Sequence, residues 1–207
     1  MSSQSKYEDD LASIRNMMDR TSKFMSLSGL SGILSGIYAL IGAGIAYFLL
    51  PVPLSYPGHN GAAMPPGNVL FQLAAVAFLV LLATIATTIW FSARKAGKAG
   101  TRVWDTSSKT LLAHLGVPVV SGGIFIVALL AYGHYGMVAP ACLVFYGLGL
   151  VNASPNLYDE VRYLGYSEIV LGLMAAAVPG LGLLFWALGF GALHILYGTL
   201  MFRKYDR

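Results

Sequence analysis

The chain has 207 residues, of which 57% are apolar and only 11% are charged, with 24 glycines. Soluble domains average about 25% charged residues, so this composition excludes an ordinary soluble domain and indicates a polytopic membrane protein. The formal net charge of +4 predicts a basic face against anionic lipid headgroups, and we expect membrane lipids rather than nucleic acid as partners.

The first predicted element is an amphipathic helix over residues 1–24. Tyr7, Leu11, Ile14 and Met18 recur every three or four residues, while charged residues occupy the other faces. Such a helix would lie on the inner headgroups or against the end of the helical bundle. Self-association of this helix, or docking of a cytoplasmic protein partner, are alternatives that the sequence leaves open.

Six apolar runs follow, and a hydrocarbon core of roughly 30 Å needs about 20 such residues per helix. We predict spans at about 25–50, 68–92, 110–132, 137–153, 157–178 and 182–202. The fifth span is predicted to begin near Asn156, with Ser154 as its N-cap and Pro155 at the first helical position. The predicted fold class is therefore all-α, with residues 25–207 forming one bundle of six transmembrane helices in three hairpins.

Small residues at every fourth position of the first span predict close helix packing. The stripe consists of Ser28, Gly32 and Gly36. In lipid, small residues let two helix backbones approach closely. The neighbouring helix could belong to the same chain or to a second copy, so a homo-oligomer is one possible consequence.

The basic residues predict the topology, because Lys and Arg are retained in cytoplasmic loops. All 13 of them fall in residues 1–24, 93–109, 154–167 or the tail from residue 203. The connections 51–67, 133–136 and 179–182 contain no Lys, Arg, Asp or Glu. This alternation predicts a multi-pass protein of a bacterial inner membrane with both termini in the cytoplasm.

The last predicted hairpin carries an acid and an imidazole, Glu168 and His194, inside otherwise uncharged apolar runs. Positions on its two arms lie level when their numbers sum to roughly 362, which pairs these two residues. The same rule pairs Gly172 with Gly191, and Gly165 with Gly198. We therefore expect Glu168 and His194 to face each other across a seam lined by glycines.

Several interpretations of this pair are open. It could be a polar clasp that holds the hairpin, or a site that responds to protons or contacts a solute, since ionisable residues within a membrane are functional candidates. His114 and Asn152 are further candidates, because they are predicted at a similar depth toward the cytoplasmic side. Zinc binding by Glu168, His194 and His114 is chemically possible, but no spaced ligand motif supports it, so we predict no metal and no cofactor.

The glycines and prolines of this hairpin carry a family resemblance. Gly172, Pro179-Gly180, Gly189, Gly191 and Gly198, in two short spans joined by a Pro-Gly turn, resemble the repeated hairpins of the HdeD-like small bacterial membrane proteins. The resemblance covers roughly the last 40 residues. It implies six spans built from repeated helical hairpins and an association with acid stress.

The sequence favours a non-enzymatic function. It contains no His-Glu-x-x-His, no Gly-x-Ser-x-Gly, no phosphate-binding glycine loop and no cysteine pair. We expect a sensing, stress or partner-docking role with a polar pocket in the inner leaflet. A channel or small-solute carrier built by oligomerisation, and a small membrane-embedded enzyme using Glu168 and His194, are the alternatives.

Overall fold

The computed structural model describes residues 28–50, 67–98 and 106–206, so the predicted amphipathic helix over residues 1–24 lies outside the described residues. The elements within these ranges are all helical. In chain order they are α2 (Gly29–Leu49), α3 (Gly67–Lys98), α4 (Thr106–Ala131), the 3-10 turn η1 (Tyr135–Met137), α5 (Val138–Ala153), the 3-10 turn η2 (Ser154–Asn156), α6 (Asp159–Ala177), α7 (Gly182–Trp186), the π-helical segment η3 (Ala187–Leu193) and α8 (His194–Tyr205).

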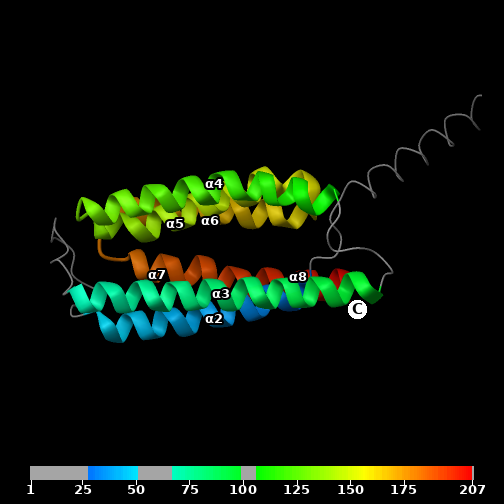
Figure 1. Cartoon of the computed structure of the whole chain (residues 1–207), viewed down its shortest axis with the longest axis horizontal. Coiled ribbons are helices and arrows are strands. Elements are labelled where there is room, and N and C mark those ends of the chain that lie inside the picture. The colour runs from blue at the N-terminus through cyan, green and yellow to red at the C-terminus, as the bar shows by residue number, and fades with distance from the viewer. Residues whose placement is uncertain (1–27, 51–66, 99–105, 207) are drawn as a thin grey trace, which may run out of the picture.

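These helices form two layers (Figure 1). One layer contains α4, α5 and α6, with α5 packed against both of the others. The second layer contains α2, α3 and the continuous stretch α7–η3–α8, with α2 packed against both α3 and α8. Contacts of α7, η3 and α8 with α5 and α6 join the two layers.

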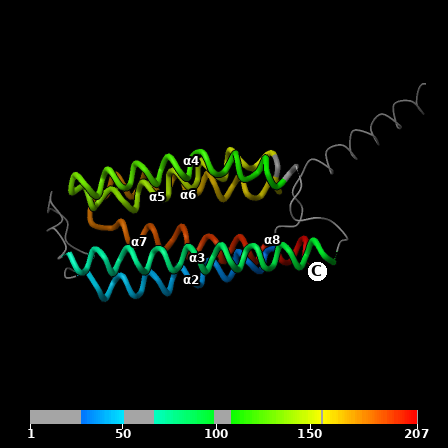
Figure 2. The backbone as a smooth tube through the Cα atoms, in the orientation of Figure 1, coloured from blue at the N-terminus to red at the C-terminus, as the bar shows by residue number. Residues whose placement is uncertain are grey.

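The chain crosses from one layer to the other between α6 and α7 (Figure 2). Gly180, in this turn, has a φ of 90°, a conformation that residues with side chains rarely adopt. Before the turn, α6 lies mainly against α5; after it, α8 lies mainly against α2. The predicted third hairpin is therefore split between the layers, whereas α2 packs on α3 and α4 packs on α5.

Five helical stretches are long and apolar enough to cross a membrane: Gly29–Leu49, Gly67–Lys98, Ser108–Ala131, Tyr135–Ala153 and Gly182–Tyr205. The predicted fifth span, which corresponds to α6, does not reach this standard. It has 19 residues and includes Asp159, Glu160, Arg162 and Glu168. The structure thus describes an all-helical protein with several apolar helices compatible with a multi-pass membrane protein.

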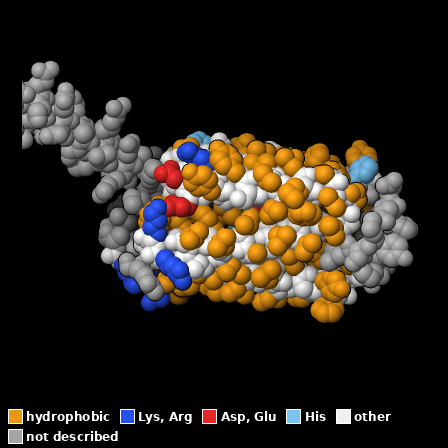
Figure 3. All heavy atoms as spheres, turned by 180° about the vertical axis from the view of Figure 1, so that it is seen from behind, with side chains coloured by type: hydrophobic (Ala, Val, Ile, Leu, Met, Phe, Trp, Pro, Cys, Tyr) orange, Lys and Arg blue, Asp and Glu red, His pale blue; other side chains and the backbone are white. Residues whose placement is uncertain are grey.

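The surface agrees with this description. Large apolar side chains point outward along the bundle, among them Phe71, Phe78, Ile124 and Val127. In the view of Figure 3, apolar side chains cover most of the surface, and the Lys, Arg, Asp and Glu side chains gather at one end. An apolar belt with its charges at one end suits a molecule surrounded by lipid.

The start of α6 differs from the prediction. Residues Ser154–Asn156 form a 3-10 turn, and α6 begins only at Asp159, with Tyr158 at the N-cap position. The hydroxyl of Ser154 donates to the carbonyl oxygen of Val151 at 2.7 Å, in the turn before it, so it does not cap the next helix. The predicted start near Asn156 was wrong because this serine closes α5 instead of opening α6.

The predicted glycine seam between the two arms of the last hairpin was also wrong. A Cβ atom added to Gly172 would lie 2.7 Å from Cγ2 of Val144 and 3.0 Å from the carbonyl oxygen of Pro140, both on α5. A Cβ added to Gly198 would lie 2.5 Å from the backbone nitrogen of Ile33 on α2, and one added to Gly191 would meet Leu40 of α2. These three glycines therefore face helices of their own layers, whereas a Cβ added to Gly189 would meet Glu168 of α6.

The small-residue stripe of the first span packs within the same chain. A Cβ added to Gly32 would lie 3.1 Å from Cα of Gly198, and one added to Gly36 would lie 2.6 Å from the carbonyl oxygen of Gly191. The neighbour that the sequence left undecided is thus α8 with η3. Ser28 has a different role, because its hydroxyl donates to Oδ2 of Asp206 at 2.9 Å.

Candidate functional site

Glu168 and His194 meet at the boundary between the two layers. Glu168 projects from α6 and is fully buried, with 0% of its side chain exposed, and His194 begins α8 and is also buried. Oε1 of Glu168 lies 3.4 Å from Nδ1 of His194. Although α6 and α8 belong to different layers, this level of the bundle brings the two ionisable side chains together.

The imidazole ring of His194 has a partner at each nitrogen. Nδ1 lies 3.0 Å from the carbonyl oxygen of Gly189, and Nε2 lies 2.9 Å from the hydroxyl of Tyr146 on α5. A carbonyl oxygen only accepts, so Nδ1 carries the proton in this contact. In the neutral ring Nε2 is then the acceptor, and Tyr146 donates to it.

The carboxylate of Glu168, in contrast, has no hydrogen-bond partner among the described residues at either oxygen. Its 3.4 Å contact with Nδ1 of His194 is electrostatic, because the proton on that nitrogen is directed at Gly189. Burying a carboxylate without a donor costs several kcal/mol, so its neutral, protonated form is favoured in such a place. The carboxylate can therefore be neutralised by taking up a proton, whereas both nitrogens of the imidazole already have hydrogen-bond partners.

A π-helical segment shapes the site on the side of α8. The segment η3 directly precedes His194, and π-bulges occur frequently at functional sites. Gly189 lies within it, and a Cβ added there would collide with Oε2 of Glu168 and lie 2.5 Å from Cδ2 of Leu143. The wide turn and the glycine together let the backbone of η3 approach the carboxylate of α6.

Aromatic rings enclose the imidazole. The ring of Phe190 stacks on that of His194 with centroids 5.9 Å apart and lies 5.1 Å from the ring of Tyr146. The ring of Trp186 in turn packs against the ring of Phe190, with ring centroids 5.1 Å apart. Such rings keep water away and strengthen the electrostatic interactions of the enclosed groups.

The other two predicted site residues, His114 and Asn152, lie on α4 and α5. The side chain of Asn152 donates to the backbone carbonyl oxygen of His114 at 2.7 Å, so these residues meet each other through the main chain of α4. His114 itself is exposed. Among residues 28–50, 67–98 and 106–206, no three His, Cys, Asp or Glu side chains gather in a way that could hold a metal ion, so the considered zinc set of Glu168, His194 and His114 does not form.

Sequence reasoning missed Tyr146 and Gly189 as parts of the site. Tyr146 lies in the run Phe145 to Gly149, and Gly189 lies in the run Phe185 to Gly191. Both runs combine aromatic residues with glycines. Nothing in these runs pointed to His194. Only the layer arrangement brings α5 beside the start of α8.

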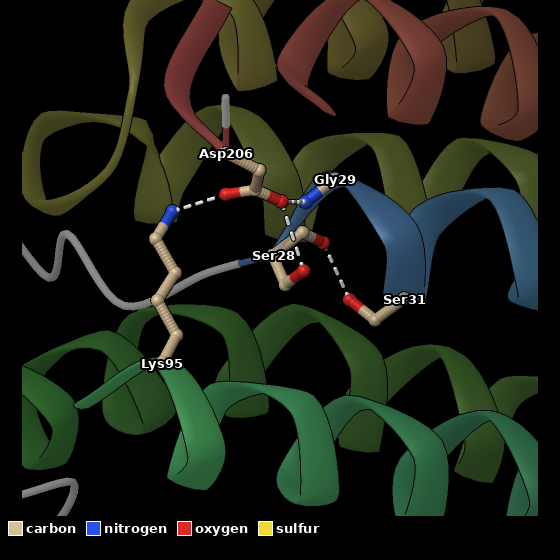
Figure 4. A network of polar contacts seen from close by, with 5 residues as sticks. All are labelled: Ser28, Gly29, Ser31, Lys95 and Asp206. Carbon is tan, nitrogen blue, oxygen red and sulfur yellow. Dashed lines mark hydrogen bonds and ion pairs between the residues drawn. The ribbon is translucent and has the colours of Figure 1, made fainter. Parts of the chain in front are cut away.

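A second polar network, also missed, ties three helix ends together at the charged end (Figure 4). Asp206 accepts hydrogen bonds from the backbone nitrogen of Gly29 at 2.8 Å and from the hydroxyl of Ser28, and it pairs with Lys95 of α3 at 2.6 Å. Burial alone raises the pKa of Asp206, but the hydrogen bonds from Lys95, Ser28 and Gly29 outweigh burial and lower it. A carboxylate at the start of α2 also interacts favourably with the helix dipole.

A third network joins α6 to α8 at the same end. Glu160 in the first turn of α6 accepts hydrogen bonds from the hydroxyl of Tyr205, at 2.9 and 3.0 Å to its two oxygens, and pairs with Lys204. The ring of Tyr205 stacks on that of Tyr158 with centroids 4.0 Å apart. The same two helices that carry Glu168 and His194 are therefore linked again at the bundle end.

Comparisons of this chain with protein-family models, with curated proteins and with solved structures found no match.

Proposed function

We propose that this protein is a non-enzymatic, six-span sensor of the bacterial inner membrane, with both termini in the cytoplasm, and that its Glu168–His194 pair responds to protons. The observation that carries the proposal is the carboxylate of Glu168, which is fully buried and has no hydrogen-bond donor among the described residues. A proton is the smallest species that would satisfy it. The resemblance of the last hairpin to HdeD-like proteins agrees with a role in acid stress.

The position of the pair supports a sensing role. Glu168 belongs to the layer of α4, α5 and α6, and His194 belongs to the layer of α2, α3 and α8. A change of charge on Glu168 therefore acts on the contact between two packed units rather than within one of them. In a site of low dielectric, such a change alters the interaction across the boundary by several kcal/mol.

The proposal counts α6 as the sixth span, because of its packing and the position of its charged residues. Each layer consists of three long helical stretches. In one of them α6 packs along α5, which is itself apolar enough to cross a membrane. Asp159, Glu160 and Arg162 fall in the first turn of α6, at the charged end of the bundle, so that only Glu168 lies within its apolar part. A span with one buried acid facing a histidine is compatible with lipid, because the acid faces the bundle interior.

Trp186 offers a direct test. Its ring contacts Phe190, which in turn stacks on His194, so its fluorescence should report on the protonation of the site. In a variant carrying W90F and W104F, emission should show a transition with pH as Glu168 gains or loses its proton. The transition should disappear in E168Q.

The matched control is His114→Ala, which removes an exposed imidazole on α4 and leaves the backbone carbonyl that Asn152 uses. This variant should titrate like the parent. Emission that stays constant with pH in the parent, or a transition that survives in E168Q, would contradict the proposal.

A further inference from the structure

One face of α8 carries polar side chains from the buried site to the charged end of the bundle. Glu168 and His194 mark the inner end, and Tyr197 and Tyr205 follow on α8 at positions that share a face with His194. At 1.5 Å per residue, the 11 steps from His194 to Tyr205 span about 16 Å. The face is turned toward α6, which carries Glu160 at one level and Glu168 at the other.

The outer part of this face begins at the surface. Glu160 is partly exposed, with 21% of its side chain accessible, and it accepts hydrogen bonds from the hydroxyl of Tyr205. Lys204, which pairs with Glu160, is largely exposed. A carboxylate and a phenol in contact at the surface can exchange protons with bulk water.

Tyr197 occupies the middle of the face. Its hydroxyl oxygen is buried and has no hydrogen-bond partner among the described residues. Its electrostatic interactions are with Glu160, Tyr205 and Asp159, which places it toward the network of Glu160 and Tyr205. Its ring packs against the same apolar cluster as Tyr146 and Tyr205, a cluster that includes Leu150, Leu164 and Met201.

The inner part is formed by Tyr146, His194 and Glu168. Tyr146 donates to Nε2 of His194, and Nδ1 of the same ring faces Oε1 of Glu168 at 3.4 Å. Among the described residues, the titratable groups that face Glu168 are thus His194 from α8 and Tyr146 from α5. The segment η3 faces it with the backbone of Gly189, which carries no charge. Along the whole face, hydroxyls, an imidazole and carboxylates alternate with apolar packing residues.

We propose that this face is the route by which a proton from the charged end reaches Glu168, with Tyr197 as its middle relay. The proposal rests on the proposed function, since it names the side from which the sensed proton comes. A buried hydroxyl that lacks a protein partner is a place where water binds, because leaving it unpaired is unfavourable. Water beside Tyr197 would connect the pair Tyr205–Glu160 to Tyr146.

A protonated water on the side of Glu160 gives a proton to the hydroxyl of Tyr197, while Tyr197 passes its own proton to a water beside Tyr146. That protonated water gives a proton to the hydroxyl of Tyr146 and becomes neutral again, while Tyr146 passes its own proton to Nε2 of His194. The proton on Nδ1 of His194 then turns from the carbonyl oxygen of Gly189 to Oε1 of Glu168, and the carboxylate accepts it and becomes neutral. The net result is one proton moved from a protonated water at the charged end to Glu168, with the imidazole left neutral in its other tautomer and the hydroxyls of Tyr197 and Tyr146 unchanged.

The test is a pH jump applied to one side of vesicles that contain the W90F/W104F protein in known orientation. Orientation is determined by labelling a cysteine placed at Arg203, at the charged end. Two signals are followed in time, Trp186 emission and the infrared band of the protonated carboxyl group, which E168Q identifies as that of Glu168. A jump on the side of Arg203 should give a faster response than the same jump on the opposite side.

The variant Tyr197→Phe keeps the ring and removes the relay hydroxyl. It should slow the response about tenfold or more and leave its end point unchanged. Tyr205→Phe, at the entrance, should slow it as well and serves if Tyr197→Phe fails to fold. The matched control is Tyr163→Phe, which removes a hydroxyl from an exposed residue of α6 and should leave the rate unchanged.

A parental rate in both Tyr197→Phe and Tyr205→Phe, or a faster response from the opposite side, would overturn the route while leaving the proposed function intact. A carboxyl band that never titrates would overturn both. The unchanged end point in Tyr197→Phe separates a slower path from a damaged site, because damage would also shift the equilibrium.

Discussion

Oε1 of Glu168 and Nδ1 of His194 lie 3.4 Å apart across the boundary of two helical layers, while the proton on that nitrogen is directed at Gly189. This geometry predicts a coupling that a double-mutant cycle can measure. Glu168→Gln and His194→Ala should each change thermal stability, and the double variant should differ from their sum by about 0.5–3 kcal/mol. Simple additivity would show that the two side chains do not interact.

The close approach of α2 and α8 predicts a strong effect of one methyl group. Gly198→Ala would place a Cβ 2.5 Å from the backbone nitrogen of Ile33, and backbone cannot move aside as a flexible side chain can. The substitution should destabilise the protein by about 1–3 kcal/mol in thermal unfolding. The matched control is Gly123→Ala on α4, where an added Cβ has no atom within 4 Å.

Gly123→Ala should be neutral or stabilising by up to about 1 kcal/mol, because alanine favours a helix more than glycine does. If Gly198→Ala proved as stable as this control, the two helices would have to lie farther apart than the structure places them.

Asp206 predicts a pH dependence at the charged end. Its pKa is lowered in the folded protein by Lys95, Ser28 and Gly29, so the folded state binds fewer protons than the unfolded state near the ordinary aspartate pKa of about 3.9. Its contribution to stability is therefore present above that pH and is lost as the pH falls through the lowered pKa. Asp206→Asn should destabilise the protein at neutral pH by about 1–2 kcal/mol.

The difference between Asp206→Asn and the parent should shrink as the pH is lowered below about 4, because the parent then loses the same charge. Chemical unfolding at a series of pH values measures this difference. A difference that stays constant from neutral to acid pH would mean that the charge of Asp206 makes no contribution.

The proposed passage of α6 through the membrane predicts the sides from which its two ends can be labelled. In a background carrying Cys142→Ala, cysteines placed at Arg162 and Val178, both exposed, mark the start of α6 and its far end. A membrane-impermeant thiol reagent added to whole cells should label Val178→Cys, and should label Arg162→Cys only after permeabilisation. His134→Cys, in the turn between α4 and α5, is the control for the outer side.

Labelling of Val178→Cys and Arg162→Cys from the same side would show that α6 does not cross. In that case the proposed count of six spans would be wrong.

The amino-acid sequence alone determined that this is an all-helical protein with several apolar helices, because apolar runs of this length and the sorting of its charges are local properties of the chain. It also paired Glu168 with His194, since residue spacing along two arms joined by a short turn fixes which positions lie at one level. The start of α6 escaped this reasoning, because Ser154 can close one helix as well as open the next.

Only the tertiary structure decided which helices are neighbours. The sequence placed the glycines of α6 and α8 at matching heights, but it could not show that Gly172 faces α5 and Gly198 faces α2. It could not place Tyr146 on His194, or Asp206 on Gly29, because these contacts join residues 48 and 177 positions apart. In a bilayer, helix neighbours are selected by close packing and by buried polar contacts, both of which depend on three-dimensional shape and leave no period in the sequence.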